Sequence, residues 1–264
     1  MIRNKKKRVV SFDLDLTLLD HSTMRITQSA LEAIDLLREK YYIVLATGRD
    51  MTLPGMAKHI EQIRPDAIIH ANGAKITLGE ELIADYPFPG ELTAEVIKVS
   101  KENGWCVGAY LGDYAYFAEQ ERAKEMYTEW LGFCDRKFRE AEKLLTKRVY
   151  TMLTNECPEN LDTFQKRFPQ LHLMPFGGMK GADIVRKEVS KRQGMTVLLK
   201  RWNLTLEQVV AFGDSYNDME LLKSAGIGVA MGNSDEFIKK KADYVTEDIG
   251  DDGVWKACKK LSLI

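Results

Sequence analysis

The N-terminal third of the chain alternates short, fully apolar runs with segments of helical periodicity. The apolar runs predict three buried strands, at 9–12, 42–46 and 67–69. Strands that are apolar throughout, rather than apolar at every second position, are typical of a parallel sheet covered by helices on both faces. This part of the chain therefore predicts an α/β fold.

Two amphipathic helices are expected to connect these strands. The first follows Thr27, and Ser29 and Glu32 have the spacing of a capping box. The second has apolar residues at helical spacing between Leu53 and Ile63.

The same alternation returns near the C-terminus. Ser190 is a good N-cap for a helix that buries one apolar face, and an apolar strand at 209–212 follows that helix. Another helix is expected from Ser215 to about Ala225, and a further strand at 227–230. The two ends of the chain thus predict one common sheet.

The middle of the chain has a different pattern. Gly112 and Asp113 join two apolar runs as a hairpin turn does, and helical stretches alternate with short strands beyond them. We therefore predict a Rossmann-like, mostly parallel α/β core formed by residues 1–79 and 188–264. An α+β domain is expected to be inserted at 80–187.

Composition narrows the classes of partner. The 264 residues are 45% apolar and 29% charged, and 38 basic residues face 39 acidic ones, which is typical of a globular protein without a basic excess. The short basic run from Lys5 to Arg8 is interpreted as a solvated lead-in to the first strand. No apolar run has the roughly 18 residues that a membrane helix needs. We therefore expect no nucleic-acid partner and no membrane partner.

The four cysteines are far apart and form no C-x-x-C pair. This spacing favours reduced thiols over a zinc site or a disulfide framework, and it predicts a cytoplasmic location.

Polar residues follow three of the predicted strands at their carboxyl ends, which is where an open α/β sheet binds its ligands. They form the segments Asp13-Leu14-Asp15, Thr47-Gly48-Arg49 and Gly213-Asp214-Ser215-Tyr216-Asn217-Asp218. Lys191 stands in the first turn of the helix that precedes the third of these strands.

Gathered at one sheet edge, the carboxylates of Asp13, Asp15 and Asp214 would repel one another unless a cation lay among them. Carboxylate oxygens at this density suit Mg²⁺, which commonly holds phosphate groups in proteins. Thr47 and Asn217 could donate hydrogen bonds to phosphoryl oxygens.

These four segments, in this order, resemble the motifs of the haloacid dehalogenase superfamily. The large insert resembles the α+β cap domain of the Cof-type sugar-phosphate phosphatases. Two further segments, Ile69-His70-Ala71-Asn72-Gly73-Ala74 and Val229-Ala230-Met231-Gly232-Asn233, are also similar to that subfamily. One D-x-D motif is a weak signal, but four motifs in order are a specific one.

The resemblance implies a mechanism. Asp13 would attack phosphorus and form an aspartyl-phosphate, and Asp15 would act as the general acid and then as the general base. Mg²⁺ would be held by Asp13, the main-chain carbonyl of Asp15, and Asp214, with Asp218 behind them. Phosphate would be bound by Thr47, the amides of Gly48 and Leu14, Lys191 and Asn217.

Three further residues are candidates for contact with the rest of the substrate. They are Arg49 in the core and Asp183 and Arg186 in the insert. For the two residues of the insert, a solvated hinge is an equally good interpretation.

One position departs from the subfamily pattern, because Leu16 stands where glycine is usual. We expect ordinary backbone geometry there. The four histidines show no metal-binding spacing and are interpreted as packing or surface residues.

The expected function is that of a Mg²⁺-dependent phosphatase acting on a small phosphorylated metabolite, a sugar phosphate in particular. The protein is expected to be a monomer or a weak homo-oligomer. A phosphomutase of the same superfamily and a non-catalytic phosphate-binding protein remain alternatives. As an alternative for 214–218, Ser215 would be an N-cap and Asp218 would lie in the first helical turn.

Overall fold

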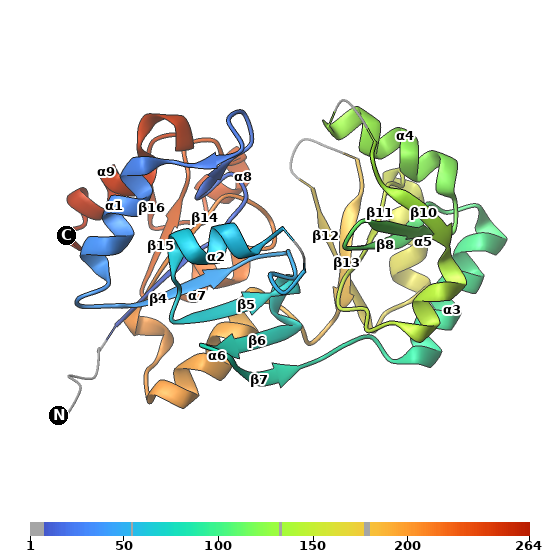
Figure 1. The fold of residues 1–264 in the computed structure, drawn as a ribbon, viewed down its shortest axis with the longest axis horizontal. Helices are drawn as coiled ribbons and strands as arrows, with labels where there is room; N and C mark the ends of the chain where they lie inside the picture. The colour runs from blue at the N-terminus through green and yellow to red at the C-terminus, as the bar shows by residue number, and fades with distance from the viewer. Residues whose placement is uncertain (1–7, 54, 132–133, 177–179) are drawn as a thin grey trace. The chain divides into compact units, whose positions relative to one another are not determined.

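The computed structural model describes residues 8–53, 55–131, 134–176 and 180–264, so most of the basic run at the N-terminus lies outside the described residues. The chain divides into two compact units, residues 1–85 with 189–264 and residues 86–188 (Figure 1). The first boundary follows the strand β7 (Glu81–Asp85), which pairs with β6 (Lys75–Leu78). Residues 80–85 therefore belong to the first unit and not, as predicted, to the insert.

The first unit is built on an eight-stranded sheet, which confirms the predicted mostly parallel α/β core. Its two antiparallel strands, β6 and β7, lie at one edge. In spatial order the strands are β16 (Tyr244–Val245), β15 (Ile227–Ala230), β14 (Val209–Gly213), β1 (Val9–Phe12), β4 (Tyr42–Ala46), β5 (Ala67–His70), β6 and β7.

The register of the three central strands aligns their carboxyl ends. Phe12 of β1 is opposite Phe212 of β14 on one side and Leu45 of β4 on the other. The residues that directly follow these strands therefore emerge at the same edge of the sheet, because parallel neighbours end at the same level.

Helices cover both faces of this sheet, as the fully apolar strands predict. One face packs against α1 (Gln28–Leu37), α2 (Ala57–Ile63) and α9 (Gly253–Lys260). The other packs against α6 (Lys191–Trp202), α7 (Met219–Ser224) and α8 (Glu236–Lys239). Neighbouring residues of one strand divide between the two cores: Val9 belongs to one and Val10 to the other.

The helix α1 begins directly after Thr27, as predicted, but its cap and the starts of two other helices differ from the prediction. Thr27 caps α1 through the amide of Ala30, so the proposed capping box of Ser29 is not formed, and Ser29 instead donates to Asp252. The helix α2 begins only at Ala57. The helix α7 begins at Met219, so Ser215 does not cap it; by contrast, Ser190 caps α6 through the amide of Gln193, as predicted.

The second unit contains a six-stranded sheet with its own apolar core. The predicted hairpin is present, with β8 antiparallel to β9. The sheet order is β10 (Lys137–Glu140), β9 (Tyr114–Phe117), β8 (Val107–Leu111), β11 (Met152–Thr154), β13 (Ala182–Arg186) and β12 (Leu171–Pro175), and the helices are α3 (Gly90–Asn103), α4 (Gln120–Leu131) and α5 (Pro158–Arg167).

Three short elements of the first unit follow its strands β1 and β5. A two-stranded ribbon of β2 (Leu19–Asp20) and β3 (Arg25–Ile26) follows the first motif, and the 3₁₀ turn η1 (Ala71–Gly73) follows β5. Within the described residues, every helix is too short or too polar to cross a lipid bilayer.

Candidate active site

Asp13 occupies the first position after β1, in the middle of the sheet. Its amide donates to the carbonyl of Phe212 at 3.0 Å, which continues the pairing of β1 with β14 past the end of the strand. Its carboxylate is almost completely buried, and Oδ1 lies 2.6 Å from Lys191 Nζ. Asp13 is thus held by the backbone and by an ion pair at the same time.

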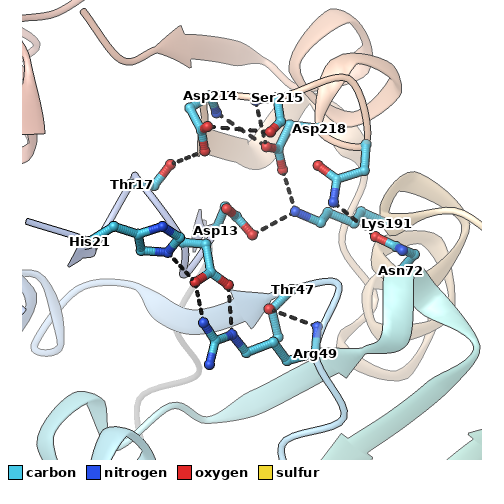
Figure 2. Close-up of polar contacts among 12 residues, drawn as sticks. Asp13, Thr17, His21, Thr47, Arg49, Asn72, Lys191, Asp214, Ser215 and Asp218 are labelled. Atoms are coloured by element: carbon cyan, nitrogen blue, oxygen red, sulfur yellow. Dashed lines mark hydrogen bonds and ion pairs between the residues drawn. The ribbon is translucent and has the colours of Figure 1, made fainter. Parts of the chain in front are cut away.

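Lys191 is the first residue of α6, and its side chain is fully buried. Its Nζ also lies 2.7 Å from Asp218 Oδ1, so one ammonium group contacts two carboxylates (Figure 2). A Cβ on Gly73 of η1 would lie 2.2 Å from the carbonyl oxygen of Ser190. The helix can therefore begin this close to the site only because residue 73 has no side chain.

Asp214 and Asp218 lie on the loop between β14 and α7. Asp218 Oδ2 accepts hydrogen bonds from the amides of Asp214 and Ser215, at 3.1 and 3.2 Å. Asp214 Oδ1 accepts from the hydroxyl of Thr17 at 3.1 Å, so Thr17 links the first motif to the last. Asp218, which the alternative interpretation placed in the first helical turn, thus orders the loop that presents Asp214.

The buried charges of this cluster do not balance. Asp13, Asp214 and Asp218 offer ligand atoms that lie within 4.8 Å of one another, and Lys191 contacts two of them, Asp13 and Asp218. When all three carboxylates are ionised, their charges and that of Lys191 leave a net charge of −2, which a divalent cation would neutralise. Carboxylate oxygens are the donors that Mg²⁺ prefers, so the residues fit this ion.

The electrostatic consequences are visible in the pKa values. Burial raises the pKa of Asp13 to about 7, against the opposing charge of Lys191. Burial and the neighbouring charge of Asp13 raise the pKa of Asp214 well above its ordinary value. Burial alone would lower the pKa of Lys191, but the carboxylates of Asp13 and Asp218 outweigh burial and raise it.

The carboxylate of Asp15 contacts different partners from that of Asp13. Arg49 binds both oxygens, with Nε 2.8 Å from Oδ2 and a terminal nitrogen 2.5 Å from Oδ1. His21 Nε2 lies 2.7 Å from Oδ1 (Figure 2). Burial would raise the pKa of Asp15, but the hydrogen bonds from His21 and Arg49 outweigh it and lower the pKa.

The interpretation of His21 as a packing or surface residue was therefore incomplete, because the side chain is half exposed but bound to Asp15. Its position six residues beyond Asp15 gives no sequence signal for this contact. Within the described residues, the cluster of possible ligand atoms is formed by the other three aspartates and does not include the carboxyl group of Asp15. Its predicted role in metal binding concerns the main-chain carbonyl and stays a prediction.

The predicted phosphate-binding residues of the core approach one another. Thr47 is fully buried, and its Oγ1 accepts from the amide of Arg49 at 3.1 Å. A Cβ on Gly48 would lie 3.6 Å from Asn217 Nδ2 and 3.3 Å from Asn72 Oδ1. The structure therefore brings Thr47, Gly48 and Asn217 to one place beside Asn72.

Asn72 is a residue that the sequence reasoning did not assign to the site. It is fully buried, and its Oδ1 accepts from Asn217 Nδ2 at 2.9 Å. The backbone amide of Asn72 donates to the carbonyl of Thr47 at 3.0 Å. Asn72 therefore connects the second motif, at Thr47, to the fourth, at Asn217. The available signal was the segment that contains it, which resembles the Cof-type subfamily.

The expectation for Leu16 was wrong. Its φ is +58°, in the left-handed region that glycine adopts most easily. Its amide donates to the carbonyl of Leu19, and its own carbonyl accepts from Asn233 Nδ2 at 2.9 Å. These hydrogen bonds hold a turn that requires a positive φ, whichever residue occupies the position. The side chain of Leu14, two positions before Leu16, is fully buried in the core.

Asp183 and Arg186 lie on β13 of the second unit. Arg186 donates to the carbonyl of Pro87 at 3.1 Å and pairs with Glu188, both in the same unit. Their contact with substrate stays a prediction.

Comparison with known proteins identifies the family. A model of the haloacid dehalogenase-like hydrolases matches residues 10–258, and the chain belongs to that family. The protein YkrA of Bacillus subtilis (strain 168) is 25% identical over 261 residues, which cover 97% of this chain and 98% of YkrA. This finding confirms the resemblance that the four motifs carry.

Solved structures agree with this assignment. The sugar phosphatase BT4131, of haloacid dehalogenase subclass IIB, is 27% identical with a TM-score of 0.85, and the match covers 97% of this chain and 100% of that one. The phosphatase BT1666 of Bacteroides thetaiotaomicron shares the fold, with a TM-score of 0.90 at 24% identity, over 100% of this chain and 98% of that one. The protein is thus an enzyme of the haloacid dehalogenase-like phosphatase class.

Proposed function

We propose that this chain is a Mg²⁺-dependent phosphatase that hydrolyses a small phosphate monoester, in particular a sugar phosphate, through an aspartyl-phosphate on Asp13. The observation that carries the proposal is the convergence of Asp13, Lys191, Asp214 and Asp218 from distant parts of the chain. The sugar phosphate is proposed because BT4131, which resembles this chain over its full length, is a sugar phosphatase.

In the first half of the reaction, a carboxylate oxygen of Asp13 forms a bond to phosphorus while the bond from phosphorus to the ester oxygen breaks. Asp15 enters this step protonated, with the proton that it takes from water at the end of each cycle, and transfers it to the departing oxygen, so the product leaves as a neutral alcohol; the negative phosphate beside Asp15 opposes the lowering of its pKa by His21 and Arg49. Lys191 offsets negative charge on the reacting carboxylate and phosphoryl group. Thr47, the amides of Gly48 and Leu14, and Asn217 are proposed to hold the phosphoryl oxygens.

In the second half, Asp15 accepts a proton from the water that attacks phosphorus, and the phosphorus bond to Asp13 breaks. Inorganic phosphate leaves, and Asp13 is restored as a carboxylate. The residues that would hold Mg²⁺ are Asp13, the main-chain carbonyl of Asp15, and Asp214. Asp218 would keep the loop of Asp214 in place. Bound there, the ion would neutralise charge on the phosphate and the nucleophile.

The substrate is expected to be a free metabolite of the cytoplasm. The enzyme is expected to be a monomer or a weak homo-oligomer. The free state of all four cysteines in the structure is consistent with this location.

A panel of phosphorylated sugars, nucleotides and cofactors tests the proposal, with Mg²⁺ present and after its removal by a chelator. We expect Mg²⁺-dependent release of inorganic phosphate from at least one sugar phosphate, and a loss of about 10³-fold or more in Asp13→Asn. Asp243→Asn is a matched control, because this carboxylate accepts from the amide of Gly228 near the amino end of β15, at the sheet edge opposite to that of Asp13. Release of an isomerised sugar phosphate would instead identify a mutase. Turnover that is undiminished in Asp13→Asn would contradict the proposal.

A further inference from the structure

The two oxygens of the Asp15 carboxylate are bound unequally. Oδ1 faces two donors, His21 Nε2 at 2.7 Å and a terminal nitrogen of Arg49 at 2.5 Å. Among the described residues, the donor to Oδ2 is Arg49 Nε alone, at 2.8 Å. A carboxylate oxygen has two lone pairs in its plane, so Oδ1 is filled and Oδ2 keeps one lone pair for a further proton.

His21 supplies the contact that creates this difference. Without it, Arg49 alone would bind the two oxygens in a symmetric, bidentate pair. An ionised carboxylate only accepts hydrogen bonds, so in this state of Asp15 the hydrogen between the two groups belongs to His21 Nε2.

The segment that carries His21 is fixed to the segment that carries Asp15. The amide of Leu16 donates to the carbonyl of Leu19 at 2.9 Å, which bridges Asp15 and the ribbon. On the two sides of His21, Asp20 accepts from the amide and hydroxyl of Ser22 and from the hydroxyl of Thr23, at 2.8 to 3.1 Å. His21 therefore sits in a hydrogen-bonded turn between two anchored strands.

We propose that His21 is a positioning residue for the acid and base Asp15. It occupies Oδ1 together with Arg49, which leaves Oδ2 as the atom that exchanges the proton with the leaving group and with water. This inference rests on the proposed function, because it needs Asp15 to transfer a proton. The competing interpretation is a surface ion pair of little consequence, which is the usual worth of a half-exposed pair.

Comparing two leaving groups distinguishes a role in proton transfer from a structural role, because a structural defect would lower the turnover of both esters equally. An alkyl phosphate such as a sugar phosphate needs a proton on its departing oxygen, whereas 4-nitrophenyl phosphate releases a stable phenolate without one. Loss of a hydrogen bond to a charged group is expected to lower kcat/KM by about 10- to 100-fold in His21→Ala on the alkyl phosphate. On 4-nitrophenyl phosphate, the expected loss in kcat/KM is less than about threefold, because kcat/KM reports the steps up to departure of the leaving group and not the later attack of water, which the two esters share.

Two variants control the experiment. His21→Gln keeps an N–H donor at a similar reach, and it should recover most of the activity on the alkyl phosphate. Thr23→Ala removes a hydrogen bond from the same turn without touching Asp15, and it should change neither substrate. Because His21 is half exposed, the alanine variant should unfold at nearly the wild-type temperature.

Equal losses on the two esters in His21→Ala, or an equal effect in Thr23→Ala, would overturn the inference while leaving the proposed function intact. No loss on either ester would overturn it as well. If the wild-type protein hydrolysed neither ester, the proposed function would fail first, and the inference with it.

Discussion

Lys191 Nζ and Asp13 Oδ1 lie 2.6 Å apart, although 178 positions separate the two residues in the sequence. The exposed fraction of the side chain is 0% for the lysine and 7% for the aspartate, so water does not screen the pair. A buried carboxylate without a partner is costly, and Asp218 depends on the same ammonium group.

Lys191→Met therefore leaves two buried carboxylates without their cation. We expect the free energy of unfolding to fall by about 3–5 kcal/mol in the absence of divalent ions, measured by urea denaturation. Lys200→Met, at an exposed position of the same helix, should change it by less than about 0.5 kcal/mol. Equal midpoints for the two variants would show that the ion pair does not hold the site together.

Gly73 is expected to be indispensable to the placement of Lys191. An added Cβ would lie 2.2 Å from the carbonyl oxygen of Ser190, the N-cap residue of α6, and φ is +104°. We predict that Gly73→Ala lowers the free energy of unfolding by about 3 kcal/mol or more and abolishes turnover, because backbone must shift to relieve the clash.

Gly79→Ala is the matched control for this change. Gly79 also has a positive φ, +56°, but an added Cβ there meets open space. Its cost should stay near the 1–2 kcal/mol of left-handed strain alone, without loss of turnover. A Gly73→Ala protein as stable and active as Gly79→Ala would contradict the close packing of η1 on α6.

The left-handed backbone at Leu16 predicts that the glycine variant is more stable than the alanine variant, the reverse of the usual order in a helix. At φ +58°, Leu16→Gly should be more stable than Leu16→Ala by about 1 kcal/mol, because glycine has no Cβ to strain. At Leu36, a half-exposed residue of α1, the alanine variant should be the more stable by about 0.5–1 kcal/mol. Thermal denaturation of the four variants measures both differences, and the same order at both positions would refute the turn geometry.

His70 predicts a loss of stability in acid. Its side chain is 1% exposed, its Nδ1 accepts from the amide of Met51, and Nε2 donates to Thr77. Burial, opposed by Asp50, lowers the pKa of His70 from 6.5 to about 4. Between these values the unfolded chain binds more protons, so the stability contributed by His70 is complete above pH 6.5 and is lost as the pH falls toward 4.

The expected loss from His70 is about 2 kcal/mol between pH 8 and pH 5. His70→Gln cannot titrate, so its stability should fall less over the same interval. Urea denaturation of both proteins at the two pH values measures the difference. Parallel pH profiles for wild type and His70→Gln would contradict the assignment of a neutral buried histidine.

Much of the fold was predictable because its strands are buried on both faces. A strand such as 42–46 has only apolar residues, and its register follows from parallel pairing, so the ends of the central strands could be aligned from sequence. The convergence of Asp13 and Asp214 follows from that alignment. The position of Lys191 followed from its capped helix start.

The rest depended on interactions that a sequence pattern does not encode. Residues 81–85 form an edge strand with partly exposed side chains. For this reason no apolar run marked the boundary between the core and the insert at this point. The φ of Leu16 is set by hydrogen bonds to Leu19 and Asn233, and the contact of His21 is set by a turn. Neither the φ of Leu16 nor the contact of His21 is marked by a periodic pattern in the sequence.

The most direct test of the central claim is to quench the enzyme in acid during turnover of a sugar phosphate and map the phosphoryl group by mass spectrometry. The proposed function predicts phosphorylation of Asp13 in the presence of Mg²⁺. It predicts none after chelation of Mg²⁺ and none in Asp13→Asn. Phosphate release without a phosphorylated Asp13, or a phosphoryl group on another residue, would contradict it.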